Sequence, residues 1–185
     1  MFEDTKNYGW PSIALHWLVA IGYLGLFALG AYMVTLGYYD ALYVTLPHWH
    51  KGLGVLLMAV VLVRICWRVL NVRPQPVAGH KDYERLVARA AHWSLNLGCV
   101  AVLLSGYFIS TAAGEGIDVF SWFTLPASPM NIANQEDIAG EIHMYVAYLV
   151  LAIAAAHALA ALKHHFFDRD QTLRRMLHPT RSSDE

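Results

Sequence analysis

Ten histidines occur in this chain of 185 residues, and several of them lie inside long apolar segments. Imidazole side chains are uncommon in such segments of membrane proteins, where they usually serve a function. His143 and His157 are 14 residues apart. In a helix this spacing separates them by roughly 21 Å along the axis and leaves them within about 40° of the same face. One helix is therefore expected to direct two imidazoles, at two depths, toward the same side.

The same 14-residue interval links a second residue to three other histidines: His50 with Arg64, His16 with Gly30, and His92 with Gly106. A glycine at such a position lets a bulky planar group approach the backbone, and an arginine would place a cation beside that group. Both residue types also have ordinary explanations, because glycines allow membrane helices to pack closely and arginines extend to the membrane surface.

The elements that must position these residues are four apolar blocks. The chain is 57% hydrophobic and only 15% charged, which is too apolar for a typical soluble domain. Each block approaches the roughly 20 residues that a helix needs to cross a membrane, and the first reads as a retained helix, not a cleaved signal peptide. We predict an all-α fold, an integral membrane four-helix bundle forming a single domain over 1–185, with helices at about 11–36, 48–70, 89–112 and 141–164.

The distribution of basic residues predicts the orientation of this bundle. Lysines and arginines gather near the N-terminus, around the second connection and in the tail: Lys6, Arg64, Arg68, Arg73, Lys81, Arg85, Arg89, Lys163, Arg169, Arg174, Arg175 and Arg181. The positive-inside rule then places both termini in the cytoplasm. The histidines fall into two layers: an outer one with His50, His143 and nearby His48, and an inner one with His16, His92 and His157.

Opposed imidazoles from different helices, at two depths, suit a low-spin iron porphyrin at each depth. Arg64 and Arg68 are candidate partners for haem propionates. A structural zinc ion usually takes four ligands, and neither layer contains a cysteine or an acidic residue. The sequence has no C-x-x-C-H motif for covalent haem attachment and no Walker, G-x-G-x-x-G or G-x-S-x-G motif.

The short stretch around His50 invites a simpler interpretation as a small H-x-H metal site. On a helix, however, His48 and His50 point about 200° apart and would not share one ion. Gly52 and Gly54 are then candidates for making room for the porphyrin, and Lys51 lies at the outer rim beside His50.

The sequence resembles the bacterial cytochrome b561 family of four-helix, di-haem membrane cytochromes, which includes a superoxide oxidase. The resemblance covers nearly the whole chain and is carried by "IALHWL" (13–18), "HWHKGLGVLLMAVVLVRICWRV" (48–69), "ARAAHWSLNLGCVAVLLSGY" (88–107) and "EIHMYVAYLVLAIAAAHALAALKHHFFDRDQTLRRM" (141–176). It implies two haem b groups, with axial ligand pairs His16 with His157 and His50 with His143. His92 then contributes to the cofactor site without binding iron.

The resemblance also implies a function: electron transfer between the periplasmic side and ubiquinone, as a multi-pass protein of the bacterial inner membrane. In the superoxide oxidase, superoxide gives an electron at the periplasmic side and quinone binds near the cytoplasmic end. The histidine matching His164 lies near that quinone and is a suitable proton donor. Lys51 is the candidate contact for superoxide. His164 and His165, with Phe166 and Phe167, also fit an ordinary interfacial belt.

Other functions stay open at this point. The predicted outer loops are acidic, with Asp40, Glu115, Asp118, Glu136, Asp137 and Glu141 against Lys51, so their field would repel superoxide. Such a face could dock a basic partner, and the resemblance includes a branch often encoded beside a periplasmic lipocalin-like protein that binds isoprenoids or quinones. The loop 113–141 is interpreted either as a lid over the outer haem or as an interfacial segment carrying Trp122 and Phe123. A non-redox alternative is a metal transporter or membrane scaffold.

Overall fold

The computed structural model describes residues 7–72, 74–77, 79–130 and 132–179. In this part of the chain the helices are α1 (Trp10–Met33), α2 (Thr45–Leu70), α3 (Asp82–Ser110) and α4 (Gln135–Phe166). Each is long and apolar enough to cross a membrane, and no more than 17% of its apolar window is buried within the chain. The outward surface is therefore apolar, as lipid contact requires, and the predicted all-α membrane bundle is confirmed. Lys6, Arg73 and Arg181, used to predict orientation, lie outside the described residues.

Several helix ends differ from the predicted ones, and two helices begin early because polar residues extend them beyond their apolar blocks. α3 begins at Asp82, seven residues before the predicted start, where the carboxylate of Glu84 accepts a 2.9 Å hydrogen bond from the Lys81 N–H. α4 begins at Gln135 instead of 141, with Glu136 and Asp137 in its first turn. Acidic side chains at a helix N-terminus offset the helix dipole. α2 also begins three residues early, and α1 ends at Met33, three residues before the predicted end.

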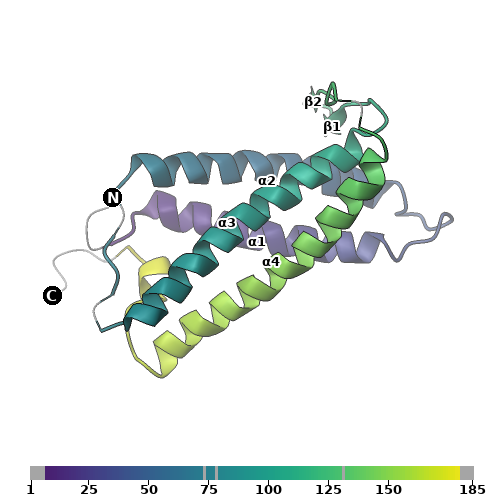
Figure 1. Cartoon of the computed structure of the whole chain (residues 1–185). Helices are drawn as coiled ribbons and strands as arrows, with labels where there is room; N and C mark the ends of the chain where they lie inside the picture. The colour runs from purple at the N-terminus through teal and green to yellow at the C-terminus, as the bar shows by residue number, and fades with distance from the viewer. Residues whose placement is uncertain (1–6, 73, 78, 131, 180–185) are drawn as a thin grey trace.

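The helices form two pairs. α1 packs mainly on α2 and α3 mainly on α4, whereas the contacts between the pairs run chiefly through α2 and α3 (Figure 1). The central core joins both pairs and consists of Tyr23, Leu57, Val61, Val102 and Val150. Within it, the Tyr23 hydroxyl donates a 2.8 Å hydrogen bond to the Ala147 carbonyl, which ties α1 to α4. This core separates the two ends of the bundle, so each end can hold its own site.

One end of the bundle, called here the hairpin end, carries the strands β1 (Ile117–Val119) and β2 (Phe123–Leu125). They pair antiparallel, with Val119 opposite Phe123. The turn residues Phe120 and Ser121 both have positive φ, 53° and 58°, as a type I′ turn requires. Neither is glycine, so this turn is strained and depends on packing. That packing comes from Val119, which is fully buried, and from contacts of β1 with α2.

The opposite end, called here the η1 end, is where α1 begins and α4 ends (Figure 1). After α4 the chain folds back and forms the short 3-10 helix η1 (Arg174–Met176). The Trp17 indole donates to the Met176 carbonyl at 2.7 Å, and Arg175 donates to the Gln75 carbonyl at 3.0 Å. The C-terminal segment therefore rests against both α1 and the α2–α3 connection.

Candidate functional site

Two imidazoles face each other at the hairpin end. His50 on α2 and His143 on α4 have ring centroids 6.1 Å apart, with the rings inclined at 74°. Imidazoles that bind one metal ion from opposite sides, each through a bond of about 2 Å, have centroids roughly 6 Å apart. The two histidines come from different helix pairs, so a group held between them would lie between the pairs. This geometry fits the bis-imidazole iron site that the sequence predicts.

His143 is oriented by α3. Its Nδ1 lies 2.9 Å from the Val102 carbonyl and 3.3 Å from the Ser105 hydroxyl, and that hydroxyl itself donates to Val102. Because a carbonyl can only accept, Nδ1 carries the proton, and the lone pair of Nε2 is left for a metal. Sequence reasoning missed Ser105, although a polar residue inside an apolar block was an available signal.

The predicted glycines lie against the imidazole rings of the two predicted ligands. A Cβ at Gly30 would be 3.0 Å from Cε1 of His50, and one at Gly106 would be 3.1 Å from Cε1 of His143. Both glycines therefore make room for an imidazole ring, whereas the sequence suggested that they make room for the porphyrin itself. A larger residue at either position would push the imidazole out of its place.

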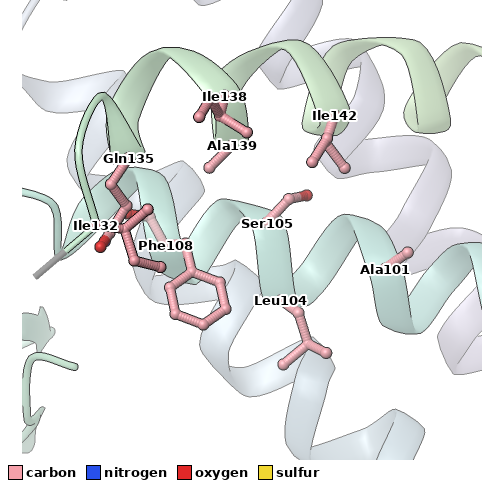
Figure 2. Close-up of a pocket in the computed structure, with 9 residues that line it drawn as sticks. All are labelled: Ala101, Leu104, Ser105, Phe108, Ile132, Gln135, Ile138, Ala139 and Ile142. Carbon is pink, nitrogen blue, oxygen red and sulfur yellow. The ribbon is translucent and has the colours of Figure 1, made fainter. Parts of the chain in front are cut away.

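Two apolar grooves lie within the helix pairs. The first, of about 290 Å³, runs between α3 and α4, and Figure 2 shows Ser105 projecting from α3 toward Ala139 and Ile142 on α4. The second, of about 370 Å³, lies between α1 and α2 and includes Gly22 and Gly25. Their linings are almost wholly hydrocarbon, so they suit acyl or isoprenoid chains better than polar ligands.

The hairpin covers the α2 start of this site. The Phe120 ring lies 5.8 Å from the rings of both His48 and Trp49, and a Cβ at Gly52 would come within 2.9 Å of it. Gly52 thus receives Phe120 instead of a porphyrin, and nothing lies within 4 Å of a Cβ at Gly54. Lys51 is exposed, and the imidazole of His48 points to Asp118 at 4.0 Å. Trp122 and Phe123 are exposed, so the loop both packs on α2 through Phe120 and presents aromatic side chains outward.

At the η1 end, the imidazoles of His16, His92 and His157 lie close together inside the bundle. His92 and His157 touch, with centroids 5.1 Å apart, and His16 is close enough to interact electrostatically with both. The 5.1 Å separation is shorter than the roughly 6 Å needed for an iron ion between two opposed rings. This arrangement therefore favours His92 as a neighbour of His157 and not as its partner in binding iron. His16, which comes from the other helix pair, stays the predicted partner.

Arg64 is fixed beside this cluster. Its guanidinium donates a 2.6 Å hydrogen bond to the Asn96 side-chain carbonyl, and the Asn96 amide donates at 2.6 Å to the His92 carbonyl. Arg68 follows one turn later on α2 and is half-buried. A cation held in this way can balance anionic groups of a cofactor. Sequence reasoning missed Asn96, which is the feature that directs Arg64 inward.

His164 lies apart from the three imidazoles, in the last turn of α4. Its Nδ1 is 2.7 Å from Oδ2 of Asp168 and 3.2 Å from Oδ2 of Asp170. The hydrogen bond from Lys163 holds the pKa of Asp168 below its ordinary value. Burial raises the pKa of Asp170, but hydrogen bonds from His80 and Thr172 outweigh it, so this pKa also lies below the ordinary value. Phe166 and Phe167 are exposed, as an interfacial belt requires, but His164 is not part of it.

A membrane bundle with opposed histidines between two helix pairs defines a class, the membrane-bound cytochromes. The profile of the family described as prokaryotic cytochrome b561 matches residues 7–179, and the chain belongs to this family. It is therefore a multi-pass membrane electron-transfer protein that binds b-type haem.

Relatives agree with this assignment. The chain is 46% identical over 177 residues to cytochrome b561 homolog 2 of Escherichia coli (strain K12), covering 95% of this chain and 94% of the relative. It is 26% identical over 180 residues to the probable superoxide oxidase CybB of Yersinia pestis, covering 93% and 96%. Cytochrome b561 homolog 1 of Escherichia coli (strain K12) is also 26% identical, over 182 residues, covering 95% and 96%.

Proposed function

We propose that this protein is a di-haem cytochrome of the bacterial inner membrane that transfers electrons between the periplasmic side and the ubiquinone pool. One haem b would be held by His50 and His143, and the other by His16 and His157. The observation that carries the proposal is the facing of His50 and His143 at 6.1 Å across the two helix pairs. The basic residues near the η1 end favour a cytoplasmic location for that end.

The reaction we propose is superoxide oxidation coupled to quinone reduction. Two superoxide ions give two electrons and leave as two molecules of O₂, and one ubiquinone takes up the two electrons and two protons. A bound haem supplies reversible one-electron chemistry through its iron. Lys51, exposed beside His50, would attract the anion locally.

The residues at the η1 end would serve the quinone. His164 is held between two carboxylates, and its imidazole would pass a proton to a quinone oxygen, with Asp168 and Asp170 supporting the charged ring. Arg64, fixed by Asn96, would balance anionic charge on the cofactor.

Stopped-flow measurement of superoxide decay, with purified haem-loaded protein and with or without ubiquinone, tests the proposal. The decay should be faster than spontaneous dismutation and should depend on quinone. Lys51→Gln should slow it, whereas Arg85→Gln, an exposed cation at the η1 end, should not. A decay rate equal to that of dismutation in the wild-type protein would refute the superoxide reaction.

His164→Gln gives a separate readout. Quinol formation should slow while the haem spectrum stays unchanged, and His178→Gln in the exposed C-terminal segment should have no effect. Equal quinol formation by both variants would remove His164 from the proposed proton path.

A second candidate is favoured by the hairpin end itself. Trp122 is 73% exposed in the turn of the hairpin, and exposed acidic side chains lie at the same end of the bundle, with Asp118 on β1 and Glu136 and Asp137 in the first turn of α4. An aromatic anchor within an acidic surface suits a docked protein. The partner would be a periplasmic carrier such as the lipocalin-like protein that the resemblance suggests. Charge reversal at Glu136 and Asp137 should then abolish reduction of the partner without changing superoxide decay.

A further inference from the structure

A group of potential metal ligands lies at the η1 end, away from both histidine layers. His80 from the α2–α3 connection, His164 from α4 and Asp170 from the C-terminal segment each offer one donor atom. Nε2 of His80, Nδ1 of His164 and Oδ2 of Asp170 all lie within 4.8 Å of one another. Their side chains are only 17%, 15% and 14% exposed. Three chain segments that are distant in sequence therefore converge on one partly buried point.

Hydrogen bonding accounts for only part of this convergence. His80 and Asp170 make a 2.7 Å contact that serves as an ordinary hydrogen bond. In contrast, the buried Nδ1 of His164 has no partner in hydrogen-bonding geometry within the described chain, although two carboxylate oxygens lie 2.7 and 3.2 Å from it. A buried nitrogen that lies 3.2 Å from Oδ2 of Asp170 without a hydrogen bond to it can bind a metal ion together with that oxygen.

The charges at this point are unbalanced. Lys163 contacts two carboxylates, those of Glu84 and Asp168, whereas the carboxylate of Asp170 contacts the imidazoles of His80 and His164. Because an imidazole that binds a metal ion is neutral, three carboxylates and one ammonium group would then leave two negative charges. Partly buried charges are costly unless they are paired, so a divalent cation would neutralise the group.

The structure also separates two overlapping sets of donors. Glu84, His164 and Asp168 form a second possible set, but Lys163 already bridges its two carboxylates, at 3.4 Å from Glu84 and 2.6 Å from Asp168. The set containing His80 is not bridged by a lysine among the described contacts. Because Lys163 already neutralises the other set, the set that is open to a cation is His80, His164 and Asp170.

We propose that His80, His164 and Asp170 bind a divalent transition-metal ion of the Zn²⁺ type. Two imidazoles and one carboxylate suit Zn²⁺, which binds nitrogen and oxygen donors at about 2.0–2.2 Å, with water in the fourth position. The ion would fasten the α2–α3 connection and the C-terminal segment to the end of α4. It would also occupy Nδ1 of His164. An effect of Zn²⁺ on quinone reduction rests on the role proposed for His164 above, but the binding itself does not.

Titration calorimetry with Zn²⁺ on the haem-loaded, detergent-purified full chain tests the site. The wild type should bind one ion, and binding should weaken about 10-fold or more in His80→Gln and in Asp170→Asn, since each change removes a ligand. Asp168→Asn, which disables only the lysine-bridged set, and His178→Gln, which removes a nearby exposed histidine, should both leave the affinity within about 3-fold of the wild type. An unchanged haem spectrum shows that each variant is folded.

A thermal readout keeps the proposal falsifiable if one variant binds haem poorly. Zn²⁺ should raise the unfolding temperature of the wild type and of Asp168→Asn, because a ligand that binds only the folded state stabilises it, but not that of Asp170→Asn. Absence of saturable binding, loss of binding in Asp168→Asn alone, or full binding in His80→Gln would each overturn the proposal. Superoxide and quinone assays play no part in this outcome, so the site stands or falls separately from the proposed function.

Discussion

The two ends of the bundle hold histidines in contrasting surroundings. At the hairpin end, two imidazoles face each other at 6.1 Å, with a glycine against each ring and the hairpin packed on the start of α2. At the η1 end, three imidazoles lie near Arg64, and a further group of histidines, carboxylates and a lysine surrounds His164.

This difference in surroundings would let the two ends of one bundle carry out different steps of electron transfer. Under the proposed function, the hairpin end suits a step that moves only an electron, since the hydrogen-bonding partners of His143 are a carbonyl and a hydroxyl and include no charged side chain. The η1 end has groups that can hold protons and balance charge, which quinone chemistry requires.

The largest effect is expected from removal of a predicted axial ligand, which should change one end of the bundle and not the other. His143→Ala should remove the haem at the hairpin end and leave about half of the bound haem, because a six-coordinate b-type haem depends on both imidazoles. Haem per protein, measured by pyridine haemochrome, reports the loss. Retention of all the haem would place the cofactor elsewhere.

The three imidazoles at the η1 end can be sorted by a paired substitution. His16→Ala should abolish the second haem, whereas His92→Ala should retain it with a shifted reduction potential, since His92 contacts His157 without opposing it. Redox titration followed at the α-band separates these outcomes. The reverse result would make His92 the ligand and would reassign the inner pair.

The glycines behind the hairpin-end rings provide a graded test. Gly30→Ala places a Cβ 3.0 Å from Cε1 of His50, so the ring must shift by a few tenths of an ångström. We expect an altered spectrum and potential of that haem but no loss of it. Gly25→Ala on the same helix meets nothing within 4 Å and is the matched control. Identical spectra for both variants would show that Gly30 is only a packing residue.

The cation at the η1 end should affect one haem and not the other. Arg64→Gln removes a positive charge near the three imidazoles, so the reduction potential there should fall. Arg68→Gln, one turn away, should have a smaller effect. Equal shifts at both haems would mean that the charge acts through the whole bundle and that the two ends are not independent.

The smallest effect expected is on the pH dependence of the η1 end. The pKa values of Asp168 and Asp170 lie below the ordinary 3.8. Their contribution to folding is therefore fully present above pH 3.8 and is lost as the pH falls through the lower folded-state values. Hydrogen exchange of residues 167–179 should increase in that range and at higher pH in Asp170→Asn. Hydrogen exchange in the hairpin should not change over this pH range. An equal increase there would contradict the difference between the two ends.

The sequence by itself determined the membrane-spanning helices, their number and the common helix face of His143 and His157. These are local properties, set by apolar length and by the 3.6-residue period. It also indicated that Gly30 and Gly106 lie at the depth of the predicted outer ligands, because 14 residues of helix span the distance between the two histidine layers.

The tertiary structure alone decided what touches these residues. Gly30 receives an imidazole, Gly52 receives Phe120, Arg64 turns toward Asn96, and His80 meets His164 and Asp170. The packing of the hairpin on α2 and the return of the C-terminal segment were also decided only by the tertiary structure. Each joins segments far apart in sequence, and no periodic pattern records such contacts, because they depend on how the two helix pairs pack and on where the connecting segments return.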